Sequence, residues 1–138
     1  MTCLRTIIRD RPWTLVYSLT YALWAGPLAT VAGHRVSSAF TIIGAGYLAN
    51  AMGVIMIIGG GAALAGLIQR NHTAEGIGLV TMAVASALYA LGVLLGLGFA
   101  GQVAGSLAIA AAVSMSVAAF NILSDAHTRA LAEEVREW

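Results

Sequence analysis

The chain has 138 residues, of which 59% are hydrophobic and 9% are charged, and its formal net charge is +1. A soluble domain usually carries about 25% charged residues, so this composition excludes an ordinary soluble domain, and so small a net charge gives no reason to expect nucleic acid binding. Cys3 is the single cysteine, which excludes an intramolecular disulfide and a cysteine-based metal site.

The distribution of charges is the strongest signal in the sequence. Three runs without Asp, Glu, Lys or Arg cover residues 12–34, 36–69 and 76–124, and they are 23, 34 and 49 residues long. A single membrane-spanning helix needs about 20 apolar residues, so the first two runs hold one span each and the third holds two. The sequence therefore predicts an all-α membrane protein, a single domain over residues 1–138, with four transmembrane helices and short loops.

The first span is expected at residues 12–33. Asp10 stands before Arg11 and Pro12, which is typical of a helix N-cap followed by a first-turn proline. The apolar run is longer than the roughly 7–15 residues of a signal-peptide core, so we expect a retained span rather than a cleaved leader. Gly26-Pro27 should kink this helix.

The second span is expected at residues 38–67, and it contains a glycine-rich face. Residues at spacings of 4, 3, 4, 3 and 4 share that face: Gly46, Asn50, Gly53, Ile57, Gly60 and Leu64. Asn50 is either an amide clip to another helix, worth about 0.6–2 kcal/mol, or a polar point that lines a pore or an ion path. Its glycine neighbours favour the clip, because they let another backbone come close.

The third and fourth spans are expected at residues 76–97 and 103–123, joined by a tight, uncharged loop at 98–102. Gly92 and Gly96 form a GxxxG motif in the third span. In the fourth span small residues recur on one face: Gly101, Gly105, Ala108, Ala112, Ser116 and Ala119. Because helices in lipid associate through small residues, we expect a tight hairpin of these two spans, with a second small face available for contacts between copies.

Arginine placement predicts the orientation of the chain. With the N-terminus in the cytosol, the cytosolic side holds six arginines and the other side holds Arg35; the six are Arg5, Arg9, Arg11, Arg70, Arg129 and Arg136. This bias predicts both termini on the cytosolic side of a bacterial inner membrane. Residues 125–138 are expected to form a cytosolic amphipathic helix whose charge of −2 is opposite to the +2 of residues 1–12, so we hypothesise that the two ends attract each other.

Residues that could carry chemistry are scarce. No Asp, Glu, Lys or Arg lies inside a predicted span, which weakens the case for proton-coupled transport. His34, His72 and His127 lie outside the predicted spans and far apart, so neither a metal nor a haem is expected. No enzyme signature is present, and we expect a non-enzymatic protein without catalytic residues or cofactors.

Two resemblances bear on function. Gly46-Tyr-Leu-Ala-Asn50-Ala-Met-Gly53 is similar to a Gly…Asn…Gly stretch in fluoride channels of the small dual-topology type. The chain lacks that family's phenylalanine and threonine-rich segment in the third span and its arginine motif in the first. The resemblance is confined to this one stretch of about a dozen residues.

The second resemblance concerns the chain as a whole. Its short length, several Gly/Ala-rich spans and charged tail resemble a phage holin-type lysis protein. That resemblance implies self-association in the inner membrane and lesions that release an endolysin. Two other interpretations stay open: an accessory or assembly subunit of a larger membrane complex, and a small ion channel or transporter with Asn50 in its path. All three have the lipid bilayer as a partner.

Overall fold

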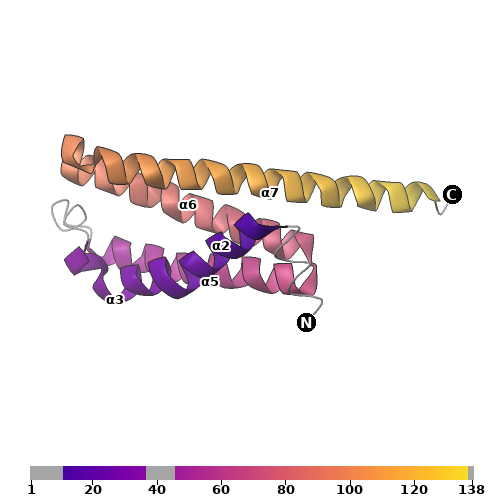
Figure 1. Ribbon diagram of the computed structural model, residues 1–138, viewed down its shortest axis with the longest axis horizontal. Helices are drawn as coiled ribbons and strands as arrows, with labels where there is room; N and C mark the ends of the chain where they lie inside the picture. Colours follow the sequence, from indigo (N-terminus) through magenta and orange to yellow (C-terminus); the bar gives the residue numbers. More distant parts are fainter. Residues whose placement is uncertain (1–10, 37–45, 137–138) are drawn as a thin grey trace.

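The computed structural model describes residues 11–36 and 46–136, and every one of them except Arg11, Arg70 and Asn71 is helical. The described residues form four helical rods that follow one another in sequence (Figure 1). The first rod is made of α2 (Pro12–Thr20), η1 (Tyr21–Ala25) and α3 (Gly26–Val36), and it is followed by α5 (Gly46–Gln69), α6 (His72–Leu97), the short η2 (Gly98–Gly101) and α7 (Gln102–Arg136). The predicted all-α class is confirmed.

Within the described residues, three helices are long enough and apolar enough to cross a membrane. They cover Tyr47–Gln69, His72–Leu97 and Gln102–Ala132. The first rod consists of three shorter pieces and is not among them, so a fourth span stays a prediction. The loop predicted at 98–102 is the single 3₁₀ turn η2, and the predicted start of the second span lies in residues 37–45, outside the described residues.

The first rod changes its winding directly before its proline. Residues Tyr21–Ala25 form a π-helical turn, and the Gly26 N–H donates to the Tyr21 carbonyl five residues earlier. Pro27 has no N–H, and its ring would collide with the preceding turn of a regular α-helix. The wider turn accommodates the ring, and the helix resumes at Gly26.

The connection between α5 and α6 is a two-residue link. Arg70 adopts a left-handed backbone with φ 56°; the Asn71 N–H donates to the Gly66 carbonyl at 2.8 Å and the Arg70 N–H to the Leu67 carbonyl at 3.4 Å. This is the Schellman arrangement, with an arginine where glycine is usual. The Asn71 side chain then caps α6 by accepting from the Ala74 N–H at 3.2 Å. Helix α6 therefore begins four residues before residue 76, where the third span is predicted to start.

Neighbouring rods pack side by side in chain order: the first rod on α5, α5 on α6, and α6 on α7 (Figure 1). The largest buried cluster joins α5, α6 and α7 through Ala63, Leu79, Met82 and Met115, each fully buried. Gly78 permits the close approach of α5 and α6, because a Cβ there would overlap the backbone of Ala63.

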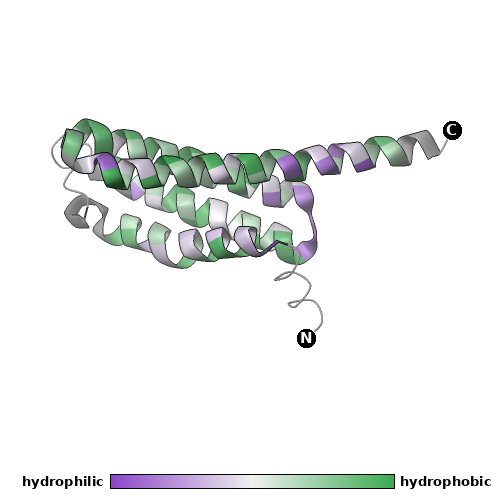
Figure 2. Cartoon of the chain, turned by 45° about the horizontal axis from the view of Figure 1, so that its top comes forward, coloured by the Kyte–Doolittle hydropathy of each residue, from purple (hydrophilic) through white to green (hydrophobic). Residues whose placement is uncertain are grey.

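Helix α7 is longer than its neighbours. At about 1.5 Å per residue, its 35 residues reach beyond the 24 of α5 and the 26 of α6, and its C-terminal part projects past the bundle (Figure 1). The projecting part carries most of the hydrophilic residues of α7 (Figure 2). The predicted tail helix is thus the continuation of α7 rather than a separate element.

Candidate functional site

The glycine-rich face of α5 packs against the first rod. A Cβ on Gly53 would lie 2.5 Å from the Thr30 backbone nitrogen and 2.8 Å from the Gly26 carbonyl oxygen. A Cβ on Gly60 would lie 2.9 Å from the Ser18 carbonyl oxygen. These glycines therefore let two backbones touch, which in lipid is a principal source of helix association.

Asn50 lies one turn before Gly53 on the same helix, and its Oδ1 is buried without a hydrogen-bond partner among the described residues. An unsatisfied buried amide oxygen costs about 1–3 kcal/mol. Asn50 is thus half-buried in α5, the helix that packs on the first rod. Among the described residues it forms no hydrogen bond between α5 and another helix. Both the amide clip and the pore-lining role stay predictions.

The small residues of α7 divide between its two sides. A Cβ on Gly101 would lie 2.7 Å from the Val93 carbonyl oxygen, and one on Gly105 would lie 2.9 Å from the Leu94 side chain, so both face α6. Ala112 is buried, Ala108 is half-buried, and Ser116 is exposed and donates to the Ala112 carbonyl at 2.8 Å. The remaining predicted packing positions lie in α6, where Gly92 is buried and Gly96 half-buried, and at the first residue of α5, Gly46.

The opposite side of α7 is uncovered. Of its most apolar 18-residue stretch, 22% is buried inside the chain, against 44% and 50% for α5 and α6. Exposed residues recur there at spacings of 3, 4, 4, 3 and 4, and we name them the outer stripe: Val103, Ser106, Ala110, Ser114, Val117 and Asn121. The two serine hydroxyls bond back to their own helix, Ser106 to the Val103 carbonyl and Ser114 to the Ala110 carbonyl. The outer stripe is therefore small and weakly polar.

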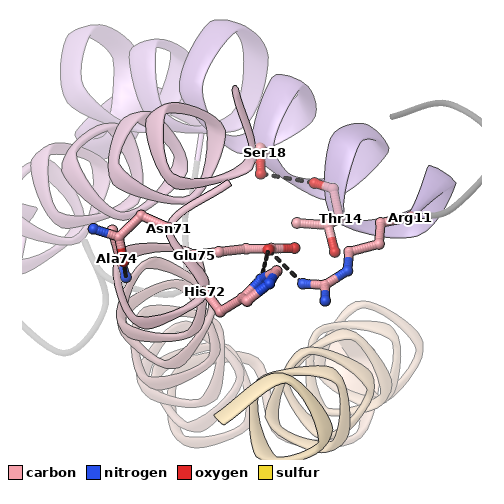
Figure 3. A network of polar contacts seen from close by, with 7 residues as sticks. All are labelled: Arg11, Thr14, Ser18, Asn71, His72, Ala74 and Glu75. Atoms are coloured by element: carbon pink, nitrogen blue, oxygen red, sulfur yellow. Dashed lines mark hydrogen bonds and ion pairs between the residues drawn. The ribbon is translucent and has the colours of Figure 1, made fainter. Parts of the chain in front are cut away.

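A buried carboxylate lies where α6 begins. The side chain of Glu75 is 1% exposed, and its Oε2 accepts a hydrogen bond from an Arg11 guanidinium nitrogen at 2.5 Å. The His72 Nδ1 lies 3.8 Å from the same oxygen, and both basic side chains point at the carboxylate (Figure 3). Arg11 stands at the N-terminus of α2, so this ion pair ties the start of the first rod to α6.

Two buried atoms in this cluster have no hydrogen-bond partner among the described residues, the Glu75 Oε1 and the His72 Nδ1. Glycines permit close packing around the start of α6. A Cβ on Gly66 would overlap the backbone at Glu75, and one on Gly76 would lie 2.7 Å from the Leu123 side chain. The favourable position of a carboxylate near a helix N-terminus adds to its stabilisation.

The expectation that no charged residue lies inside a span stays a prediction, although Glu75 lies in the first turn of α6, the helix that contains the third predicted span. The predicted third span begins at residue 76 and leaves Glu75 in the preceding loop, whereas α6 begins at His72. Asn71 was the signal that could have corrected this, since an N-cap at 71 places Glu75 within the first helical turns. Its pairing with a residue 64 positions away left no trace in the sequence.

The arginines predicted to set the topology gather at one end of the bundle. Arg11 begins the first rod, Arg70 links α5 to α6, and Arg129 lies on the projecting part of α7, all at the end where the α5–α6 connection lies (Figure 1). Arg5 and Arg9 lie outside the described residues, and Arg11 pairs with Glu75 rather than with the tail. The hypothesis that residues 1–12 attract the tail therefore stays a prediction.

Comparison with known proteins adds no relative to this description. No protein-family model, no curated protein and no solved structure matches the chain.

Proposed function

We propose that this chain is a non-enzymatic membrane protein of holin type, which self-associates in the bacterial inner membrane with both termini in the cytosol and opens lesions there. The observation that supports the proposal is the outer stripe of α7. It lies on a helix apolar enough to span a membrane, and all six of its residues are exposed.

The chemistry of the outer stripe favours a protein neighbour over lipid. Lipid tails solvate Leu and Phe well but offer nothing to an amide, whereas helix interfaces in membranes collect Ala, Ser and Asn. Asn121 is exposed and has no hydrogen bond within the described chain. A second copy of α7 would present its own Asn121 and serines to these groups, since a two-fold interface pairs the same surface on both subunits.

In a larger ring of copies, the same weakly polar groups would face water. Serine hydroxyls and the Asn121 amide tolerate contact with either a helix or an aqueous lumen, whereas a fully aliphatic face would exclude water. This dual tolerance is what a protein needs if it is to exist first as packed copies and then as a water-filled lesion.

Induced expression in a bacterium tests the proposal. Cells that make the unaltered chain should stop growing, depolarise, and release a large marker such as a fluorescent dextran loaded into spheroplasts. The paired substitutions Ser114→Leu and Asn121→Leu should delay or abolish these effects, because they convert the outer stripe to a lipid-facing surface. Ala51→Leu on the exposed side of α5 is the matched control and should behave as the unaltered chain. Polarised cells that keep growing would contradict the proposal.

A small ion channel or transporter is the second candidate, and the buried Glu75 favours it. Ionisable side chains buried in membrane helices commonly mark ion or proton pathways. In vesicles that contain the purified chain, this candidate predicts flux of small ions without release of the dextran, and a changed flux for Glu75→Gln. The lesion proposal predicts release of both, with Glu75→Gln altering stability instead.

A further inference from the structure

A cavity of about 300 Å³ lies between the first rod and the other three helices. All four rods contribute to its wall. The π-turn supplies Tyr21 and Trp24, α3 supplies Leu28, α5 supplies Met56, α6 supplies Ser86, and α7 supplies Ala108. Its volume is at the lower end of the range for small-molecule sites, which begins at about 300 Å³.

The π-turn gives the cavity its aromatic rim. The extra residue in such a turn shifts the side chains that follow relative to a regular α-helix, and π-turns in proteins occur frequently at functional sites. Here the turn contributes Tyr21 to the interior and Trp24 to the edge, where the Trp24 side chain is 72% exposed. Leu28, one turn further on, is also exposed, so the cavity opens sideways, between apolar side chains.

The polar groups in the wall are already engaged. The Tyr21 hydroxyl and the Ser86 hydroxyl lie 2.7 Å apart and form a hydrogen bond. An ordered water needs about two to four polar partners. Tyr89 also lines the cavity, and the other wall residues offer aromatic, aliphatic and thioether surface, so most of the wall is apolar. The cavity therefore suits a hydrocarbon better than water.

The position of the opening identifies the source of that hydrocarbon. Tyr21 and Trp24 lie near the middle of the 25-residue first rod, which runs from Pro12 to Val36. In a protein that spans the bilayer, an opening at that depth faces the acyl chains and is far from the headgroups. We infer that this cavity is a binding site for the hydrocarbon chain of a membrane lipid, which enters sideways between the first rod and α7.

Trp24 provides a direct reporter for the site. In a background with Trp13→Phe and Trp138→Phe, Trp24 is the single tryptophan, and bromine atoms on an acyl chain quench tryptophan fluorescence at short range. Titration of the detergent-solubilised chain with dibromostearate should give a saturable quenching phase, with one fatty acid bound per chain, on top of a linear phase from acid dissolved in the micelle.

Filling the cavity should remove the saturable phase. Ala108→Phe from α7 and Ala29→Phe from α3 each place a ring in the space, since both alanines line it. Ala104→Phe is the control, because Ala104 lies one turn earlier on α7, is exposed and does not line the cavity. Circular dichroism establishes that each variant retains its helices, and the inference is judged on those that do.

Loss of the saturable phase in the two filled variants and its retention in Ala104→Phe is the expected result. Quenching that rises linearly in the single-tryptophan chain would overturn the inference. A saturable phase of equal size in both filled variants would overturn it too, because the bound chain would then lie elsewhere. The measurement does not depend on self-association, so it is independent of the proposed lesion function.

Discussion

The ion pair of Arg11 and Glu75 should contribute strongly to the stability of the fold. Replacing Arg11 with Met leaves the carboxylate of Glu75 buried at 1% exposure without its main partner. Breaking a fully buried pair costs about 3–5 kcal/mol, and because Arg11 is partly exposed we expect a loss of about 2–3 kcal/mol in the free energy of unfolding. Unfolding in mixed micelles with increasing SDS measures it.

A double variant distinguishes the contribution of the ion pair from the effects of the two single substitutions. Arg11→Met combined with Glu75→Leu removes both charges, so much of the lost stability should return, as it does when a buried ion pair is replaced by apolar side chains. Arg129→Met, at an exposed position of α7, should change the unfolding free energy by less than about 0.5 kcal/mol. Equal losses in the single and double variants would show that the ion pair is not the source of the stability.

Arg70 carries a backbone conformation that favours glycine. Its φ of 56° costs an L-residue other than glycine about 1–2 kcal/mol, so Arg70→Gly should raise the unfolding free energy by about 1 kcal/mol. Gln69→Gly, at the last residue of α5, has no positive φ to relieve and should lower it by up to about 0.5 kcal/mol. The same SDS unfolding assay compares the two, and a loss of stability in Arg70→Gly would contradict the assignment of the turn.

At the scale of helices, two glycines of α5 test how the first rod is held. A methyl group on Gly53 would meet backbone atoms of Gly26 and Thr30 that cannot yield, whereas one on Gly61 meets nothing within 4 Å. Gly53→Ala should therefore cost about 1–3 kcal/mol through overpacking. Gly61→Ala should gain up to about 1 kcal/mol through helix propensity. If the two substitutions have the same effect on SDS unfolding, the face of α5 that meets the first rod is assigned incorrectly.

The helices could be predicted from the sequence because uncharged runs and small-residue spacings are local properties of the chain. The C-terminal limit of α6 at Leu97 and the start of α7 at Gln102 agree with the predicted spans to within one residue. The spacing also predicted the face that contains Gly53 and Gly60. It did not predict that the first rod packs on this face. Spacing along one helix says which residues share a side and is silent about which other helix covers that side.

The candidate sites were less predictable, because they depend on contacts between distant residues. Glu75 falls in the predicted loop before the third span, whereas the structure places it in α6. The π-turn that gives the cavity its rim was not predicted, although it lies directly before Gly26-Pro27, where a kink was expected. The outer stripe of α7 could be recognised only after its other side was seen packed against α6. Both faces of α7 are rich in small residues, so composition did not distinguish them.

At the scale of the whole molecule, the first rod, α5 and α6 bury their glycine faces against one another, while α7 lies at the edge with one side packed and one side bare (Figure 1). This asymmetry is the basis of the proposed self-association. The edge helix is also the one whose C-terminal part projects past the bundle, so an assembly formed along α7 would bring the charged tails of its copies together.

Cysteine cross-linking along α7 tests that central claim most directly. In a chain with Cys3→Ser, single cysteines are introduced from residue 106 to residue 121, with Gly61→Cys on the exposed side of α5 as the control. Oxidation in the membrane, read as dimers on a non-reducing gel, should be strongest at Ser106, Ala110, Ser114, Val117 and Asn121 and weak between them, because disulfides require Cα atoms within about 7 Å. Dimers that are absent at every α7 position, or as abundant at Gly61→Cys as along the outer stripe, would contradict self-association through α7.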